Sequence, residues 1–385
     1  MQPPNPAAPT HGVCVKHFQL TGITALVLLC AACGTSSEPS PAGAPPAASM
    51  VFSMTNAESG NYVYAYVRSS DGTLANATAL PTGGIGTGHG LENQGALALS
   101  QDNRYLYVVN PGSNDLSVFR MNGTDLQLAD RVPSGGNLPV SVVEWNGTVY
   151  VLNRHSGPDP GTGPSISGFR VSNAGTLTAI VGSNITLSSA NTNAAQIGIS
   201  PDGRWIVVTE RGIDQLDVVP LAEDHTPGTP HTVESAGHGP FGFAFSDALR
   251  LYIAESAAGS TSAYNIDFRG SLSVLSAALP TGQGATCWLA ISPDNQWAYV
   301  TNTSSKSISS YRIAADGGLT LAASIATTTS APPIDVVVDT AGGYLSVLTT
   351  DGAIETFRVD RVSGSLSSIQ TLTGLPRGSN GLAGN

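Results

Sequence analysis

The sequence predicts an all-β protein, a seven-bladed β-propeller made of four-stranded antiparallel blades. The first observation is a recurring phrase: a short apolar strand, a polar turn and a second strand. The second is its spacing, since the phrase ends at intervals that match blades of about forty to fifty residues, some with a loop insertion. The third is the segment after each copy, which predicts a strand with alternating apolar and polar residues and one aromatic residue. The phrase reads AQIGISPDGRWIVVTE at 195–210, LALSQDNRYLYVVN at 97–110, LAISPDNQWAYVTN at 289–302, FAFSDALRLYIAE at 243–255 and VVVDTAGGYLSVLT at 336–349.

Each phrase predicts the two inner strands of a blade and the turn between them. In the turn Ser200–Gly203, proline presets the backbone, aspartate bonds back to it and glycine supplies a left-handed position. The next strand carries the aromatic, and a leucine opens a fourth strand after another polar turn. These aromatics are Tyr66, Phe119, Phe169, Tyr264, Tyr311 and Phe357, and the leucines are Leu74, Leu126, Leu177, Leu272, Leu319 and Leu366.

The first repeat lacks its innermost strand. Met50–Asn56 already matches a second strand, whereas the tail Asn380–Asn385 resembles an opening strand with nothing after it. We therefore expect the C-terminal strand to complete the first blade and close the ring, which removes an open sheet edge.

Composition narrows the possible partners. Charged residues make up 11% of the chain, against roughly 25% in soluble domains. The net charge of −11 argues against nucleic acid, because phosphate binding needs a basic surface. We expect a monomer that binds a small molecule.

The N-terminus predicts export. Lys16 precedes the apolar run Leu20–Leu29, which is too short to span a bilayer but suits a signal peptide. Residues 1–33 resemble a lipoprotein signal with Cys33 as the lipidation site, and ordinary secretion is the alternative. Residues 34–49, rich in Pro, Ser and Ala, predict a disordered tether, and 50–385 the propeller. The expected location is the bacterial cell envelope, with membrane contact through the lipid anchor only.

Cysteine content predicts a fold without disulfides. Cleavage before Cys33 removes Cys14 and Cys30, and lipidation uses Cys33 itself. Cys287 then has no partner.

The loops predict where a ligand binds. The Ser-Pro-Asp-Gly turns share one face of a propeller, the bottom, while the second strands end on the opposite, top face. Both long insertions, Thr82–Gln94 and Arg154–Ser165, fall on the top face, and insertions on one face of a repeat array commonly carry binding.

Polar and aromatic side chains are expected to converge at the top of the central channel, where carboxylates, arginines and histidines could bind and activate a small polar ligand. Asparagines at strand ends are more often turn formers that bond their own backbone, and Glu210 beside Arg211 could form a plain ion pair. No metal motif appears, and no metal or cofactor is expected. The candidates are Glu210, Arg211 and His155 for catalysis, and Asn110, Arg154, Glu255, Trp288, Asn302 and His89 for substrate binding.

The repeat phrase, together with GPFGFAF (Gly239–Phe245), ATCW (Ala285–Trp288) and GLPRGSNGLA (Gly374–Ala383), resembles the seven-bladed lactonase-type propellers over Met50–Asn385. That superfamily includes bacterial 6-phosphogluconolactonase and the 3-carboxy-cis,cis-muconate lactonizing enzyme.

The resemblance implies a metal-free site at the top of the channel that uses Glu, Arg and His on a lactone. It assigns the carboxylate to Glu210 and the imidazole to His155 or His89. The mouth offers only Arg154 and Arg211 as arginines, which argues against a multiply anionic substrate.

Two functions are consistent with these residues. In the first, a cell-envelope lactone hydrolase, Glu210 or His155 is the general base, Arg211 stabilises the oxyanion, and Asn110, Asn302 and Trp288 position the ring. In the second, a non-catalytic envelope propeller binds a ligand or protein on its top face.

Overall fold

The computed structural model describes residues 49–385, except 160, 188, 189 and 191. All of them belong to one compact unit, Ala47–Asn385. The expected signal segment 1–33, with Cys33, and the tether up to residue 48 lie outside the described residues. Within the described part, no helix combines the length and the apolar character needed to cross a membrane.

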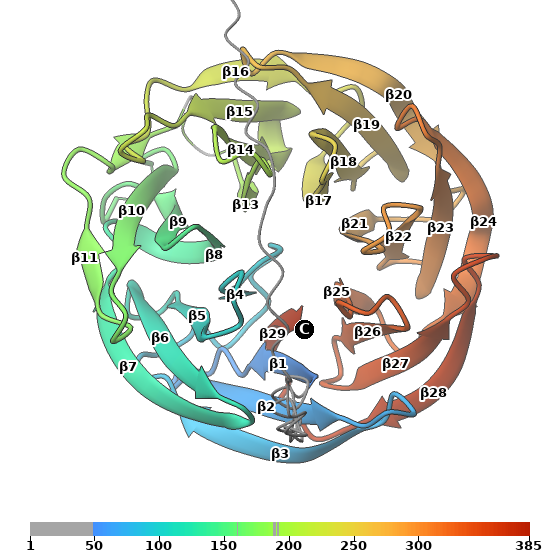
Figure 1. Cartoon of the computed structure of the whole chain (residues 1–385), viewed down its shortest axis with the longest axis horizontal. Coiled ribbons are helices and arrows are strands. Elements are labelled where there is room, and N and C mark those ends of the chain that lie inside the picture. Colours follow the sequence, from blue (N-terminus) through green and yellow to red (C-terminus); the bar gives the residue numbers. More distant parts are fainter. Residues whose placement is uncertain (1–48, 160, 188–189, 191) are drawn as a thin grey trace, which may run out of the picture. The chain divides into compact units, whose positions relative to one another are not determined.

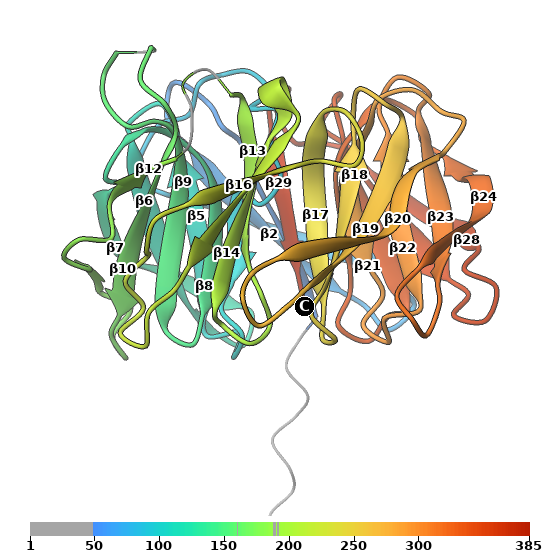
Figure 2. The same cartoon turned by 90° about the horizontal axis from the view of Figure 1, so that it is seen from above.

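The unit consists of seven antiparallel sheets arranged as a ring, each with its first strand nearest the centre (Figure 1). Six sheets have four strands, and the third has a short extra strand, β12, beside β10. This confirms the predicted seven-bladed propeller. Seen from the side, the strands run between the two faces of the ring (Figure 2).

The blades take their strands in chain order, apart from the first. Blade 1 contains β29 (Asn380–Gly384), β1 (Met50–Met54), β2 (Tyr62–Arg68) and β3 (Leu74–Pro81); blade 2 contains β4 (Leu97–Leu99), β5 (Tyr105–Asn110), β6 (Asp115–Asn122) and β7 (Asp125–Pro133). Blade 3 contains β8 (Asn137–Trp145), β9 (Thr148–His155), β10 (Ser165–Val171), β11 (Leu177–Ala179) and β12 (Ile185–Thr186). Blade 4 contains β13 (Ala194–Ile199), β14 (Trp205–Glu210), β15 (Gln215–Pro220) and β16 (His231–Glu234), with the 3₁₀ helix η1 (Arg211–Ile213) after β14. Blade 5 contains β17 (Pro240–Ser246), β18 (Arg250–Glu255), β19 (Ser260–Ile266) and β20 (Leu272–Pro280); blade 6 contains β21 (Thr286–Ile291), β22 (Trp297–Asn302), β23 (Ser307–Ile313) and β24 (Leu319–Thr328). Blade 7 contains β25 (Pro333–Val338), β26 (Tyr344–Thr349), β27 (Ile354–Val359) and β28 (Leu366–Leu372).

The C-terminal strand closes the ring as predicted. β29 pairs antiparallel with β1, and Phe52 lies opposite Ala383. Beyond the strand, the side-chain Oδ1 of Asn385 accepts a hydrogen bond of 2.7 Å from the Met50 amide. The first blade is therefore assembled from both ends of the folded unit.

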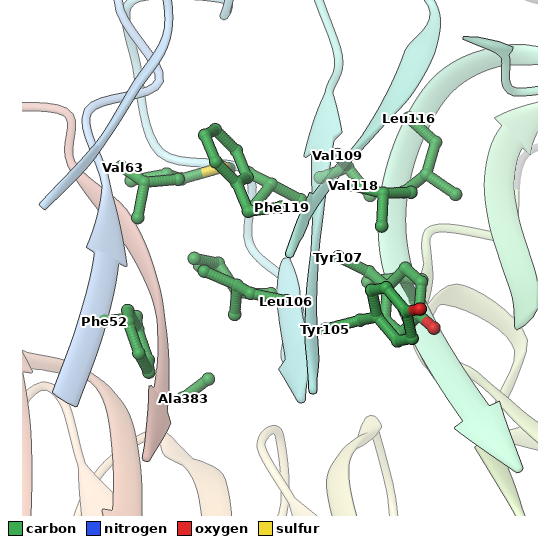
Figure 3. Packing of buried hydrophobic residues seen from close by; sticks show 14 of the residues in the cluster. Phe52, Val63, Tyr105, Leu106, Tyr107, Val109, Leu116, Val118, Phe119 and Ala383 are labelled. Carbon is green, nitrogen blue, oxygen red and sulfur yellow. The ribbon is translucent and has the colours of Figure 1, made fainter. Parts of the chain in front are cut away.

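The core lies between the blades. Every residue of the inner strand β5 is buried, whereas the outer strand β7 is largely exposed. A continuous apolar run is typical of a strand covered on both faces. Figure 3 shows one such cluster, in which Phe52 and Ala383 of blade 1 and Phe119 of blade 2 belong to the same buried group.

Aromatic residues at the start of second strands pack on glycines of the next blade, near the bottom face. Trp205 opens β14 and covers Gly270, in the turn between β19 and β20. Gly270 has φ +78°, and a Cβ there would lie 2.5 Å from Trp205 Cζ3. The same arrangement joins Trp297 to Gly364. These glycines are needed both for their left-handed backbone and for the close approach of a ring.

Candidate functional site

Two adjoining cavities open on the top face at the mouth of the central channel. The larger, about 540 Å³, is lined by Arg211, Phe241 and Cys287 among others, and we call it the Phe241 compartment. The second, about 370 Å³, includes His89 and Arg377 and is the Arg377 compartment. Both share Glu92, Trp288 and Ile334 in their walls.

Glu92 and Arg211 form the charged centre of this mouth. Arg211 Nη2 lies 2.6 Å from Glu92 Oε2, with 65% of the Glu92 side chain exposed and 25% of that of Arg211. The hydrogen bond from Arg211 is the largest cause that lowers the pKa of Glu92. Glu92 therefore stays ionised at neutral pH. Its backbone has φ +50°, an uncommon conformation for a residue with a side chain and one that is enriched at functional sites.

Arg211 packs on the ring of Phe241, which in turn contacts Trp288. Its guanidinium carbon lies 5.4 Å from the Phe241 ring centroid, a cation–π distance. Phe241 meets Trp288 edge-on, with centroids 5.0 Å apart. Trp288 is fixed in turn by a hydrogen bond of 2.7 Å from its Nε1 to the Asn93 carbonyl, next to Glu92. The insertion Thr82–Gln94 and the inner strands β17 and β21 thus build one wall together.

Arg154 holds the Glu92 loop. Its Nη2 donates to the Leu91 carbonyl at 2.7 Å and to the Glu92 carbonyl at 3.1 Å. Burial, followed by repulsion from Arg211, lowers the pKa of Arg154 to about 10, so it still carries its charge at neutral pH. The structure therefore places this predicted binding residue behind the site, where it positions Glu92.

Cys287 contributes an uncharged surface. The side chain is buried, and burial raises the pKa of its thiol to about 11. The neutral thiol at physiological pH makes the residue a small apolar group in the wall of the Phe241 compartment.

Four predicted residues, by contrast, end second strands inside the blades: Asn110, Glu210, Glu255 and Asn302, each with no exposed surface. Asn110 makes all the hydrogen bonds that its amide allows. Its Nδ2 donates to Asp115 and Ser117, and its Oδ1 accepts from Asn61 and Thr82. It has no bond left for a ligand.

Two of the other strand ends are held in the same way. Asn302 Oδ1 accepts from Thr286 Oγ1 at 2.7 Å, and Glu255 Oε1 accepts from Ser235 Oγ at 2.8 Å. Burial raises the pKa of Glu255. In blades 2, 5 and 6, a serine or threonine of the segment that enters the blade thus bonds the side chain at the end of its second strand. The catalytic role predicted for Glu210 stays a prediction, and its burial does not favour that role.

The two predicted histidines lie apart. His89 lines the Arg377 compartment, while Nδ1 of His155 lies 3.3 Å from the Thr162 carbonyl within the second insertion. His155 is not among the described residues that line either compartment. The structure thus brings together Arg211, Trp288, His89 and, indirectly, Arg154, but not His155.

Glu92 and Arg377 line the compartments but were not predicted from the sequence, so the expectation that Arg154 and Arg211 are the only arginines of the mouth was wrong. Glu92 is the one acidic residue of the insertion Thr82–Gln94, and Arg377 is the one cation of the closing segment Gly374–Ala383. An exposed His238 also lies at the rim, beside Gly239 of the Phe241 compartment, with its Nδ1 2.8 Å from Asp214 Oδ2. The hydrogen bond to Asp214 raises the pKa of His238.

Metal ligands do not cluster in the part of the chain that the structure describes: no group of three or more His, Cys, Asp or Glu side chains there could hold an ion. The absence of a metal from the reaction remains a prediction.

Comparison with known proteins gives a family. The model of a family described as lactonase, 7-bladed beta-propeller, matches residues 46–158, 163–288 and 271–379. No curated protein matches the sequence.

Solved structures share the fold. A putative 6-phosphogluconolactonase from Bacteroides fragilis has a TM-score of 0.69 at 19% identity, covering 90% of this chain and 100% of its own. A protein from Lactobacillus plantarum has a TM-score of 0.71 at 19% identity, over 88% and 99%. The periplasmic gluconolactonase PpgL of Pseudomonas aeruginosa has a TM-score of 0.69 at 18% identity, over 88% and 98%. At these identities the likeness carries the fold alone.

Proposed function

Since this chain belongs to the family of seven-bladed lactonase β-propellers, we propose that it hydrolyses a small lactone at the top of its channel. The observation that carries the proposal is the mouth itself, where Glu92 and Arg211 meet 2.6 Å apart against the Phe241–Trp288 wall. A carboxylate, a guanidinium and an apolar wall together suit an ester carbonyl in a ring.

The proposed reaction adds water across the ring ester. The Glu92 carboxylate accepts a proton from water as its oxygen attacks the carbonyl carbon, and Arg211 donates hydrogen bonds to the oxyanion that forms. The carbonyl then re-forms, the bond to the ring oxygen breaks, and that oxygen takes the proton. The product is a hydroxy acid, and these steps use only protein side chains and water.

The test is hydrolysis of neutral and anionic lactones by the purified protein, followed by pH-stat. We expect Glu92→Gln and Arg211→Gln each to lower kcat/KM by about 10²–10³-fold, the range for removing a base or an oxyanion donor. The matched control is Arg204→Gln, which removes an exposed arginine, 3.8 Å from Asp202, at a bottom-face turn. Turnover that persists in both top-face variants would refute the assignment.

A binding propeller is the second candidate. It is favoured by the burial of Glu210 and by the pairing of Glu92 with Arg211, which leaves neither charge free. This function predicts saturable binding without turnover, lost on removal of the top-face insertion 154–165. A folded protein that hydrolyses no lactone but binds one on this face would establish it.

We further propose that the protein is exported as a monomeric lipoprotein, with Cys33 acylated and the propeller held at the cell envelope by that anchor. Palmitate labelling of the protein in cells tests this. Labelling should vanish in Cys33→Ala, and a wild-type protein that is released unlabelled into the periplasm or medium would indicate ordinary secretion instead.

A further inference from the structure

We propose that the substrate is a lactone that carries an apolar substituent, seated in the Phe241 compartment, rather than one that places a phosphate or a second carboxylate there. The inference rests on the proposed function. It adds which lactones are preferred, and it is tested separately from hydrolysis.

The walls of the Phe241 compartment carry the first argument. Phe241, Trp288 and Ile334 supply large apolar surfaces, and Ala257 and the neutral Cys287 supply small ones. Removing such apolar walls from water is favourable, so the binding of an alkyl or aryl group is favoured there.

Charge carries the second argument. Of the described residues that line this compartment, Arg211 is the one cation, and Glu92 pairs with it at 2.6 Å. Arg154 donates to the Leu91 and Glu92 carbonyls instead of facing the cavity. A phosphate or a second carboxylate in this compartment would be desolvated beside Glu92, with no cation there besides Arg211, which already serves the ring carbonyl.

Size carries the third argument. The compartment, at about 540 Å³, falls within the ~300–1,000 Å³ of sites for drug-sized ligands, more room than a bare lactone ring fills. With the ring carbonyl at Arg211, the rest of the compartment is bounded by residues that include Cys287 and Ala257, and Ala257 is exposed in the loop after β18. A substituent on the ring would occupy that space.

The experiment compares γ-butyrolactone, γ-hexalactone, γ-octalactone and γ-decalactone with 6-phosphogluconolactone, measuring kcat/KM for each. We expect a rise of about fourfold per added methylene until the compartment is full, the factor that burying one methylene gives. Binding of the matching 3-alkylcyclopentanones, in which a CH2 group replaces the ring oxygen so that they keep the ring carbonyl but cannot be hydrolysed, is followed by calorimetry.

Two variants locate the effect. Ala257→Trp fills the Phe241 compartment and should reduce the chain-length dependence to less than about twofold across the series. Thr350→Trp places the same bulk in the Arg377 compartment and should leave the dependence intact.

The outcomes separate the two proposals. Hydrolysis that ignores chain length, or that favours 6-phosphogluconolactone over γ-decalactone, overturns the inference while the proposed function stands. Ketone binding that strengthens with chain length in wild type but not in Ala257→Trp, without any hydrolysis, supports the inference about the ligand and refutes lactone hydrolysis.

Discussion

Replacing Asn110 with alanine tests whether the ends of the second strands serve the fold or the ligand. The side chain has no exposed surface and makes four hydrogen bonds, one of them to the Asp115 carboxylate at 2.6 Å. A neutral bond contributes about 1 kcal/mol and one to a charged group about 1.5–3 kcal/mol. Ser117 and Asp115 keep other partners, the Thr82 carbonyl and Arg131. Because these two partners stay bonded, the loss is smaller than the sum of the four bonds. We expect the free energy of unfolding to fall by about 3–5 kcal/mol.

The assay is urea unfolding, combined with lactone turnover per folded molecule. Asn110→Ala should unfold at a much lower urea concentration, yet the fraction that remains folded should keep its kcat/KM. The matched control is Asn122→Ala, at an exposed position of the neighbouring strand β6, which should shift stability by no more than about 0.5 kcal/mol. Loss of turnover at unchanged stability in Asn110→Ala would refute the reasoning and return the residue to the binding site.

Three further predictions concern packing and titration. Gly270→Ala should destabilise the protein by about 1–3 kcal/mol more than Gly123→Ala in urea unfolding, because both glycines have positive φ but only the former lies under a ring, that of Trp205. Equal losses would show that the backbone alone matters. Burial raises the pKa of Asp335 to about 8, so the folded chain holds a proton that the unfolded chain releases near pH ~4. The free energy of unfolding should thus fall as pH rises from about 4 to 8, by at most about 1.4 kcal/mol per pH unit, and urea midpoints should lose that slope in Asp335→Asn. Because burial raises the pKa of the Cys287 thiol to about 11, iodoacetamide at pH 8 should modify it at least about tenfold more slowly than in the urea-unfolded chain, as measured by peptide mass; equal rates would contradict a buried thiol.

The fold could be predicted almost completely, because each blade repeats one pattern of apolar strand and polar turn. The closure of the ring could also be predicted, because the first repeat lacks its innermost strand and the tail Asn380–Asn385 resembles an opening strand with no second strand after it. Several copies carry the same pattern, so the prediction did not depend on any single residue.

Which of the predicted residues reach the cavities at the mouth was harder to predict, and Glu210 and Arg211 show why. Glu210 ends β14 and Arg211 opens the 3₁₀ helix η1, so adjacent positions in the sequence belong to different elements, one inside the blade and one at the cavity. Glu210 has no exposed surface, whereas Arg211 lines the Phe241 compartment. Both had been predicted to lie at the mouth.

Glu92 illustrates a second limit. It lies in an insertion that has no counterpart in the other repeats, and its place depends on contacts with Arg154 and Arg211, far away in sequence. Periodicity carries no information about such a loop, because its conformation is decided by tertiary hydrogen bonds rather than by strand alternation.

The split first blade also governs the order in which this protein can fold. Met50 and Asn385 lie 335 positions apart, so the pairing of β29 with β1 has the long loop closure that makes folding slow. Blades 2 to 7 can form from contiguous segments during synthesis. β1, whose five residues are all buried in the final ring, lacks its partner strand until the C-terminus has been synthesised. Until β29 arrives, that apolar edge is open to pairing with another chain. A chain shortened before residue 380 would therefore be expected to aggregate through blade 1 rather than to fold as a six-bladed ring.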